Sequence, residues 1–154
     1  MRTWASGVTI VTASFENEQH GMTVNSFTSV AMEPPLISIS LQSESRTFAL
    51  VSKSNAFAVT ILEENQLEIS DRFAGRLPDS EDQWIGIETE TLITGAPLIK
   101  GGLAYFDCRV TKAIPVGSNT LFLAEVIATR ENPNGQPLLY YNRNYQNLVK
   151  LQRP

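Results

Sequence analysis

Apolar and polar residues alternate with a period of two along short stretches of this chain. Over residues 36–41, Ile37, Ile39 and Leu41 would lie on one face of a strand, and two serines on the other. Residues 57–61 repeat the alternation. This period predicts half-buried β-strands.

Further strands are predicted where β-branched or apolar runs stand between turn residues. These runs cover residues 8–13, 20–24, 103–116, 121–130 and 138–141. The polar residues 15–19 predict a hairpin between the first two runs, and residues 117–119 predict a turn between the two long ones. Several short strands separated by turn signals indicate a closed barrel or a sandwich.

Two short helices are predicted between the strands. Residues 46–52 form the first. Residues 65–68 read Asn-Gln-Leu-Glu, a pattern that resembles a capping box and predicts a second helix over residues 66–74. Gly75 can adopt the left-handed conformation that ends a helix. Residues 76–83 are polar and include a proline, so they predict a surface loop.

Small polar residues stand in the region 21–47 at positions where a strand pair would usually bury large apolar side chains. They are Thr23, Asn25, Ser26, Ser38 and Ser40. Because buried polar atoms need partners, this composition predicts a place for a planar, anionic ligand. A strand whose polar face is exposed to solvent explains the same composition equally well.

The start of the first predicted helix carries groups that bind phosphate. Hydroxyl groups and a guanidinium gather there on Ser43, Ser45, Thr47 and Arg46. Unpaired backbone amides at a helix N-terminus favour an anion, and an arginine adds positive charge. This segment is therefore the predicted phosphate receptor.

Composition limits the classes of protein to which the chain can belong. A length of 154 residues is typical of one domain, so we expect a single domain over residues 1–154. A net charge of −4 argues against a nucleic-acid partner, and no apolar run is long enough to span a membrane. Only 18% of residues are charged, below the roughly 25% that is typical, which leaves surface for a partner and predicts a homodimer.

The chain has one cysteine and one histidine. Cys108 cannot form an internal disulfide, which favours a cytoplasmic location, and its strand-face neighbours Phe106 and Val110 indicate a small buried hydrophobe. The usual sets of metal ligands cannot be assembled, so no metal site is predicted. His20 follows a hairpin and is expected to be exposed or hydrogen-bonded rather than catalytic. No residue is predicted to be catalytic.

Segments spread along nearly the whole chain form an ordered set: residues 7–12, 21–27, 33–36, 45–47, 72–74, 101–104, 117–120 and 137–141. Each is weakly specific alone. Together they resemble the flavin reductase-like family of FMN-binding split β-barrels, which supply the reductase component of two-component flavin-dependent monooxygenases. The resemblance implies a mostly β fold, an FMN-binding split β-barrel with Greek-key-like strands and two or three short helices.

The resemblance also implies a set of site residues. Those expected to hold the flavin are Thr23, Val24, Asn25, Ser26, Ser40, Leu41, Gln42, Ser45, Arg46, Thr47 and Phe73. Those expected on the nicotinamide side are Asn119, Tyr141 and Tyr145. The implied cofactor is FMN, with FAD as the alternative, and NADH or NADPH is the implied electron donor. A flavin-dependent monooxygenase is the implied partner.

Two positions depart from the pattern of many family members. Ser43 and Glu44 replace a local basic residue, which leaves Arg46 or Lys53 to neutralise a phosphate. Asn119 stands where a histidine is usual, and an amide cannot become cationic. Three hypotheses therefore remain: an NAD(P)H-dependent flavin reductase, a flavoprotein that holds FMN tightly for another acceptor, and a non-enzymatic flavin-binding module.

Overall fold

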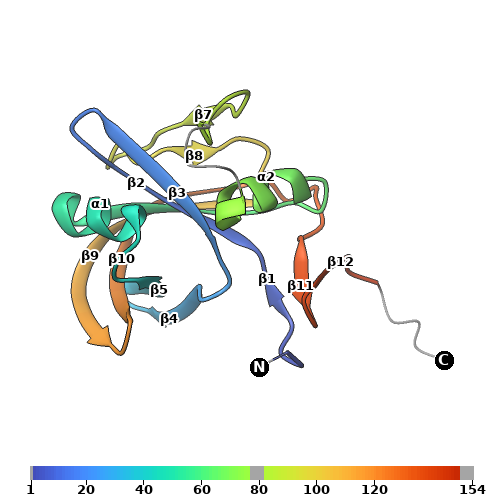
Figure 1. The fold of residues 1–154 in the computed structure, drawn as a ribbon, viewed down its shortest axis with the longest axis horizontal. Coiled ribbons are helices and arrows are strands. Elements are labelled where there is room, and N and C mark those ends of the chain that lie inside the picture. Colours follow the sequence, from blue (N-terminus) through green and yellow to red (C-terminus); the bar gives the residue numbers. More distant parts are fainter. Residues whose placement is uncertain (1, 77–81, 150–154) are drawn as a thin grey trace.

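The computed structural model describes residues 2–76 and 82–149, and β-strands dominate it (Figure 1). In this described part, the largest sheet is antiparallel and has the strand order β3–β2–β6–β9–β10–β5–β4. Its strands are β2 (Thr9–Phe15), β3 (Glu18–Val24), β4 (Thr28–Met32), β5 (Pro35–Gln42), β6 (Ala56–Ile61), β9 (Ala104–Val116) and β10 (Asn119–Glu131).

Two smaller sheets and two helices complete the described structure. The strands are β1 (Ser6–Gly7), which pairs with β11 (Leu139–Tyr141) and so joins β12 (Asn144–Gln146), and the pair β7 (Thr89–Glu90) and β8 (Leu98–Ile99). The helices are α1 (Arg46–Ser54) and α2 (Leu67–Asp71), the latter continued by a π-helical turn, η1 (Arg72–Arg76). In Figure 1, α1 lies at the left of the view and α2 to the right of it.

The large sheet curls until its β3 and β5 regions approach each other without forming a hydrogen-bonded ladder. Two register shifts in the β9–β10 hairpin help to bend the sheet, since a bulge increases local twist. The prediction of a mostly β split barrel with two short helices is confirmed.

The barrel interior is filled by the apolar face that the period of two predicted. Ile37, Ile39 and Leu41 of β5 are buried there together with Phe57 and Phe122. The apolar side of α1 packs on the same core and closes it against β2 and β3. A second cluster includes Phe73 of η1, and Ile69 of α2 packs against it.

The predicted capping box at residues 65–68 is wrong. The N-cap of α2 is Gln66, and its side chain makes no capping bond. Its Oε1 instead accepts from the Glu63 amide at 3.0 Å, and its Nε2 donates to the Lys100 carbonyl at 3.0 Å. The α-helical part covers Leu67–Asp71 and continues as η1, in which Gly75 has a φ of 72°, the left-handed exit that was expected.

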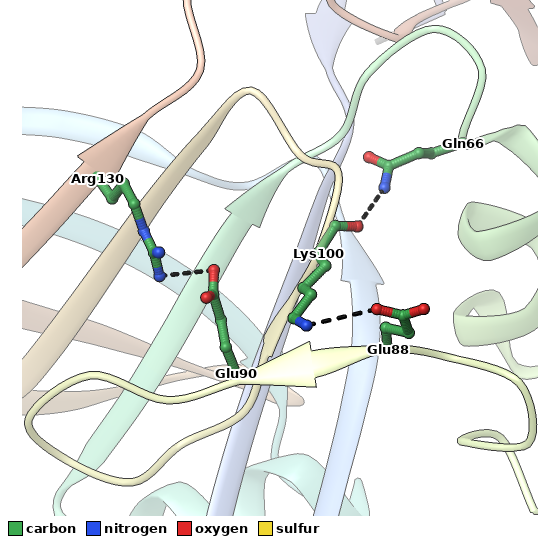
Figure 2. Close-up of polar contacts among 5 residues, drawn as sticks. All are labelled: Gln66, Glu88, Glu90, Lys100 and Arg130. Atoms are coloured by element: carbon green, nitrogen blue, oxygen red, sulfur yellow. Dashed lines mark hydrogen bonds and ion pairs between the residues drawn. The ribbon is translucent and has the colours of Figure 1, made fainter.

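Polar contacts surround the two-stranded ribbon formed by β7 and β8 and connect it to the barrel. Figure 2 shows Arg130 paired with Glu90 at 2.6 Å and Lys100 paired with Glu88 at 3.4 Å, next to the Gln66 bond. Exposed ion pairs of this kind contribute little stability. The buried carboxylate of Asp107 is the stronger anchor of the ribbon, because it accepts backbone bonds from residues 93 and 94 at 2.6 and 2.8 Å.

Asn119 was predicted in a turn, but it is the first residue of β10. It pairs with Val116 on β9 and with Gln42 on β5. The turn contains only Gly117 and Ser118, and Gly117 has a φ of 60°. A two-residue turn of this kind matches the twist of the strands, so pairing begins at residue 119, two residues before the predicted strand.

Candidate functional site

A cleft of about 750 Å³ opens between β3, the start of α1, and the α2–η1 segment. Many of the predicted flavin residues line it, together with one from the nicotinamide group: Thr23, Val24, Asn25, Gln42, Ser45, Arg46, Thr47, Phe73 and Tyr145. The lining does not include Ser26, Ser40, Leu41, Asn119 or Tyr141. The structure thus divides the predicted site residues into those that line the cleft and those that do not, and their roles in binding stay predictions.

One end of the cleft is the N-terminus of α1. Ser45 caps this helix, since its hydroxyl accepts from the Phe48 amide at 3.2 Å and donates to the Gln42 carbonyl at 2.8 Å. The amides of the first helical turn have no partner within the helix. With the Arg46 guanidinium beside them in the lining, this end of the cleft has the chemistry of an anion receptor.

His20 lies next to this anion receptor. Its Nδ1 is 2.8 Å from the Oγ1 of the fully buried Thr47, and its Nε2 is 3.4 Å from the Nε2 of Gln83. Burial lowers the pKa of the His20 imidazole, and the positive charge of Arg46 lowers it further. His20 is hydrogen-bonded, as one of the two sequence expectations had it, and it is therefore neutral at pH 7 in the ligand-free protein.

Gly21 brings the backbone of β3 to the cleft. Its amide donates to the Gln83 Oε1 at 2.8 Å, and its carbonyl accepts from the Gln83 Nε2 at 3.2 Å. A Cβ atom here would lie 2.9 Å from the Phe73 ring and 3.0 Å from Thr12, so the position requires glycine for close packing. Gln83 thus binds the open edge of β3 and places residues 82–84 at the cleft.

Aromatic rings form the far wall of the cleft. Phe73 and Trp84 meet edge to face, with ring centroids 5.1 Å apart, and Tyr140 and Tyr145 do the same at 5.4 Å. The indole Nε1 of Trp84 is buried and has no hydrogen-bond partner in the described structure. Such a wall offers apolar faces to a planar ligand.

Tyr145 is fixed by polar contacts between α2 and β12. Its hydroxyl lies 2.9 Å from both the Ser70 hydroxyl and the Asp71 carboxylate, and Thr23 donates to the Ser70 carbonyl at 2.6 Å. Tyr141, by contrast, is 43% exposed and stands outside the lining, whereas its neighbour Tyr140 lies within it.

Ser26, Ser40 and Asn119 form a polar chain behind the cleft. The Ser26 hydroxyl bonds both backbone groups of Ser40, and the Ser40 hydroxyl accepts from the Asn119 Nδ2 at 3.2 Å. Leu41 is fully buried in the barrel core. These side chains hold the wall from which Gln42 reaches the cleft.

Several lining residues were not among the predicted site residues, namely His20, Gly21, Ser70, Gln83, Trp84 and Tyr140. Trp84 also packs on the second core cluster. Gln83 and Trp84 follow a polar stretch with no periodicity, so no local pattern could bring them to β3. Gly21 stood in the segment that carried the resemblance, which was a usable signal.

Outside the cleft, the described residues bear on three other kinds of site, namely a metal centre, a reactive thiol and a membrane span. Among the described residues, no group of three or more metal-ligating side chains is found. Cys108 is buried, and burial together with the nearby Asp107 raises the pKa of its thiol, so it is not a nucleophile. None of the helices in the described ranges has the length and apolarity that crossing a bilayer requires.

A split β-barrel whose cleft joins a helix N-terminus to an aromatic wall defines a binding protein for a planar ligand with an anionic tail. Residues 1–149 match the family described as flavin reductase like domain, and the chain belongs to this family.

Individual relatives agree with the family assignment. The chain is 36% identical over 145 residues to the NADH-dependent flavin reductase StyB of Pseudomonas fluorescens, covering 92% of this chain and 82% of StyB. It is 33% identical over 146 residues to the reductase component of 4-hydroxyphenylacetate 3-monooxygenase from Thermus thermophilus, covering 95% and 91%. The solved structure of the NADH:FAD oxidoreductase SgcE6 of Streptomyces globisporus superposes with a TM-score of 0.90 at 32% identity, covering 96% and 89%.

Proposed function

We propose that this protein is an NADH-dependent flavin reductase that transfers a hydride to FMN or FAD and supplies the reduced flavin to a partner monooxygenase. The observation that carries the proposal is the single cleft that joins the Arg46 end of α1 to the Phe73–Trp84 wall. The relatives named above as flavin reductases and as a monooxygenase reductase component support the same activity.

The residues of the cleft fit a flavin. The first-turn amides of α1 and the Arg46 guanidinium suit a phosphate monoester, and the polar residues Thr23 and Asn25 suit the hydrogen-bonding edge of an isoalloxazine. The buried, unpartnered Nε1 of Trp84 adds a donor at the aromatic wall. A bound flavin supplies the hydride acceptor, and the protein supplies position and shelter from water.

No acid or base is required from the protein for this chemistry. His20 lines the cleft and its pKa is lowered, so it is neutral at pH 7. We give it no role in proton transfer to the isoalloxazine ring. Tyr145 is the nicotinamide-side candidate that lines the cleft, and its hydroxyl is held by Ser70 and Asp71. Asn119 donates to the Ser40 hydroxyl and does not line the cleft, so any effect on the nicotinamide would be indirect.

Three finer assignments belong to this proposal. FMN is the favoured flavin, because the cleft ends at one anion receptor; FAD is the alternative. NADH is the favoured donor, because the relatives whose names specify a donor use it. A homodimer is proposed from the low charged share of the sequence, with the monooxygenase as a separate partner.

Spectroscopy of the purified protein tests the proposal. We expect a nearly colourless protein after desalting, and rapid bleaching of added FMN near 450 nm when NADH is supplied under nitrogen. A yellow protein after desalting would favour the tight flavoprotein. Binding of FMN without NADH or NADPH oxidation would favour the non-enzymatic module and overturn the reductase.

A further inference from the structure

We propose that His20 is the second cation of the flavin phosphate site: neutral in the free protein with its proton on Nδ1, it takes a proton on Nε2 when a phosphate monoester binds beside Arg46. The inference rests on the proposed function and adds to it a residue, an atom and a linked proton. Ser43 and Glu44 bring no positive charge to the start of α1, so His20 would add its charge to that of Arg46.

The orientation of the Gln83 amide fixes the first step. Its Oε1 accepts from the Gly21 amide and its Nε2 donates to the Gly21 carbonyl, so the two ends of the amide cannot be exchanged. The same Nε2 is 3.4 Å from the His20 Nε2. A donor nitrogen therefore faces this ring atom, and the His20 Nε2 carries no proton in the free protein.

The position of the proton in neutral His20 follows. A neutral imidazole carries one proton, and with Nε2 as the acceptor that proton is on Nδ1. The His20 Nδ1 accordingly donates to the Oγ1 of Thr47, 2.8 Å away. Thr47 is fully buried on α1, so this bond is sheltered and persists whether or not the ring is charged. The nitrogen left to titrate is Nε2, on the side of Gln83 and the cleft.

The charges around His20 decide when Nε2 is protonated. Burial and then the positive charge of Arg46 lower the His20 pKa in the free protein. Asp82 carries a negative charge in the lining of the same cleft. Glu18 and Lys53, which have opposite charges, line a small adjoining groove that shares Arg46 with the cleft. A phosphate dianion beside Arg46 would shift this balance, because it offsets the guanidinium charge and favours the charged form of a nearby imidazole.

Nitrogen-15 NMR of the ring is a direct test, since His20 is the only histidine of the chain. We expect the neutral Nδ1–H tautomer in the free protein at pH 7.5. Saturation with FMN should raise the His20 pKa by at least one unit, whereas saturation with riboflavin, which lacks the phosphate, should leave it unchanged. The Nε2–H tautomer in the free protein, or a ring that stays neutral with FMN at pH 6.5, would overturn the inference.

Flavin binding by His20→Asn gives an independent measurement. The asparagine amide keeps a donor near the Nδ1 position for Thr47 but cannot titrate. At pH 6.5 we expect about a 5- to 20-fold weaker FMN affinity in the variant, in the range of one charged hydrogen bond, and a riboflavin affinity within about twofold of the wild type. Because the variant has no titrating side chain at this position, the pH dependence of its FMN affinity reports the ionisation of the phosphate itself, near pH 6. Parallel pH profiles for the variant and the wild type would contradict the linked proton.

The outcomes separate this inference from the proposed function. If the wild-type protein reduces FMN with NADH while His20 stays neutral, the reductase proposal stands and the role of His20 as a second cation is rejected. If the protein binds neither FMN nor riboflavin, both proposals are rejected. The NMR measurement uses the wild type only, so poor folding of His20→Asn would leave a decisive test in place.

Discussion

The Ser26 hydroxyl lies 3.0 Å from the amide nitrogen and 3.1 Å from the carbonyl oxygen of Ser40, and it bonds both. Ser40 pairs with β10 on one side, and beyond the end of β4 its other side has no strand partner. The Ser26 hydroxyl thus supplies the two hydrogen bonds that a neighbouring strand would otherwise make with Ser40. Ser26 was expected to hold the flavin, and its contact with Ser40 gives it a structural role as well.

Ser26→Ala should therefore destabilise the fold. Two backbone groups of Ser40 would lose their partner in a half-buried setting, and we expect a loss of about 1–2 kcal/mol in the free energy of unfolding. Urea denaturation measures it. Ser29→Ala, on the exposed face of β4, is the control and should change stability by less than about 0.5 kcal/mol. Equal stability of Ser26→Ala and the wild type would remove the structural role.

Gly21→Ala should disturb the cleft through packing alone. The new methyl group would lie 2.9 Å from the Phe73 ring and 3.0 Å from Thr12, and Phe73 is buried. Overpacking of this kind costs about 1–3 kcal/mol, and displacement of Phe73 should also weaken flavin binding. Gly7→Ala is a matched control, because nothing lies within 4 Å of a Cβ at that position. Thermal unfolding and FMN titration of both variants are the measurements, and similar behaviour of the two would refute the close packing.

Arg46→Ala should discriminate between flavins. Loss of the guanidinium should weaken FMN by about 1–3 kcal/mol, the range for a charged hydrogen bond, while riboflavin affinity stays nearly constant. Lys112→Ala, on β9 and outside the lining, controls for net charge. Fluorescence titration gives both dissociation constants. An equal loss for FMN and riboflavin would show that Arg46 is not at the phosphate.

The stability of the ligand-free protein should decrease on acidification because of His20. Its pKa is lowered in the folded state, by burial and then by Arg46, from an ordinary value of 6.5. Below about pH 6.5 the unfolded chain binds a proton that the native protein does not, so the free energy of unfolding falls until the native pKa is passed. His20→Gln should remove this part of the pH dependence. Urea titrations between pH 5 and 8 compare the two, and profiles of equal slope would refute the assignment.

Most of the barrel was predictable from the sequence, because the period of two reports burial directly. Ile37, Ile39 and Leu41 occupy the core as that period requires, and the helix at residue 46 begins where hydroxyl groups and Arg46 indicated. β4 was missed, since most of its residues are exposed and it lies at the edge of the sheet, so no alternation marks it.

The remaining errors have a common physical cause, which is competition from distant parts of the chain. Gln66 could have supported a helix cap, but it bonds residues 63 and 100 instead. Gln83 reaches the edge of β3 from sixty-two positions away, and no local pattern encodes such a contact. The predicted loop over residues 76–83 falls mostly on residues 77–81, which lie outside the described residues.

The last prediction separates Tyr145 from Asn119, two of the three residues expected on the nicotinamide side. Tyr145→Phe removes a hydroxyl at the cleft that is held by Ser70 and Asp71, whereas Asn119→His alters a residue that bonds Ser40 behind the wall. If Tyr145 contacts the donor, its loss should raise the Michaelis constant for NADH several-fold and change the dissociation constant of FMN by less than about twofold, because only the donor loses an interaction. Asn119→His should then have the smaller effect on NADH. Tyr141→Phe, on an exposed side chain outside the lining, is the matched control and should leave both constants unchanged. Steady-state kinetics at saturating FMN measure all three variants. A larger NADH effect for Asn119→His than for Tyr145→Phe would move the nicotinamide to the β10 side of the cleft and reject Tyr145 as its contact.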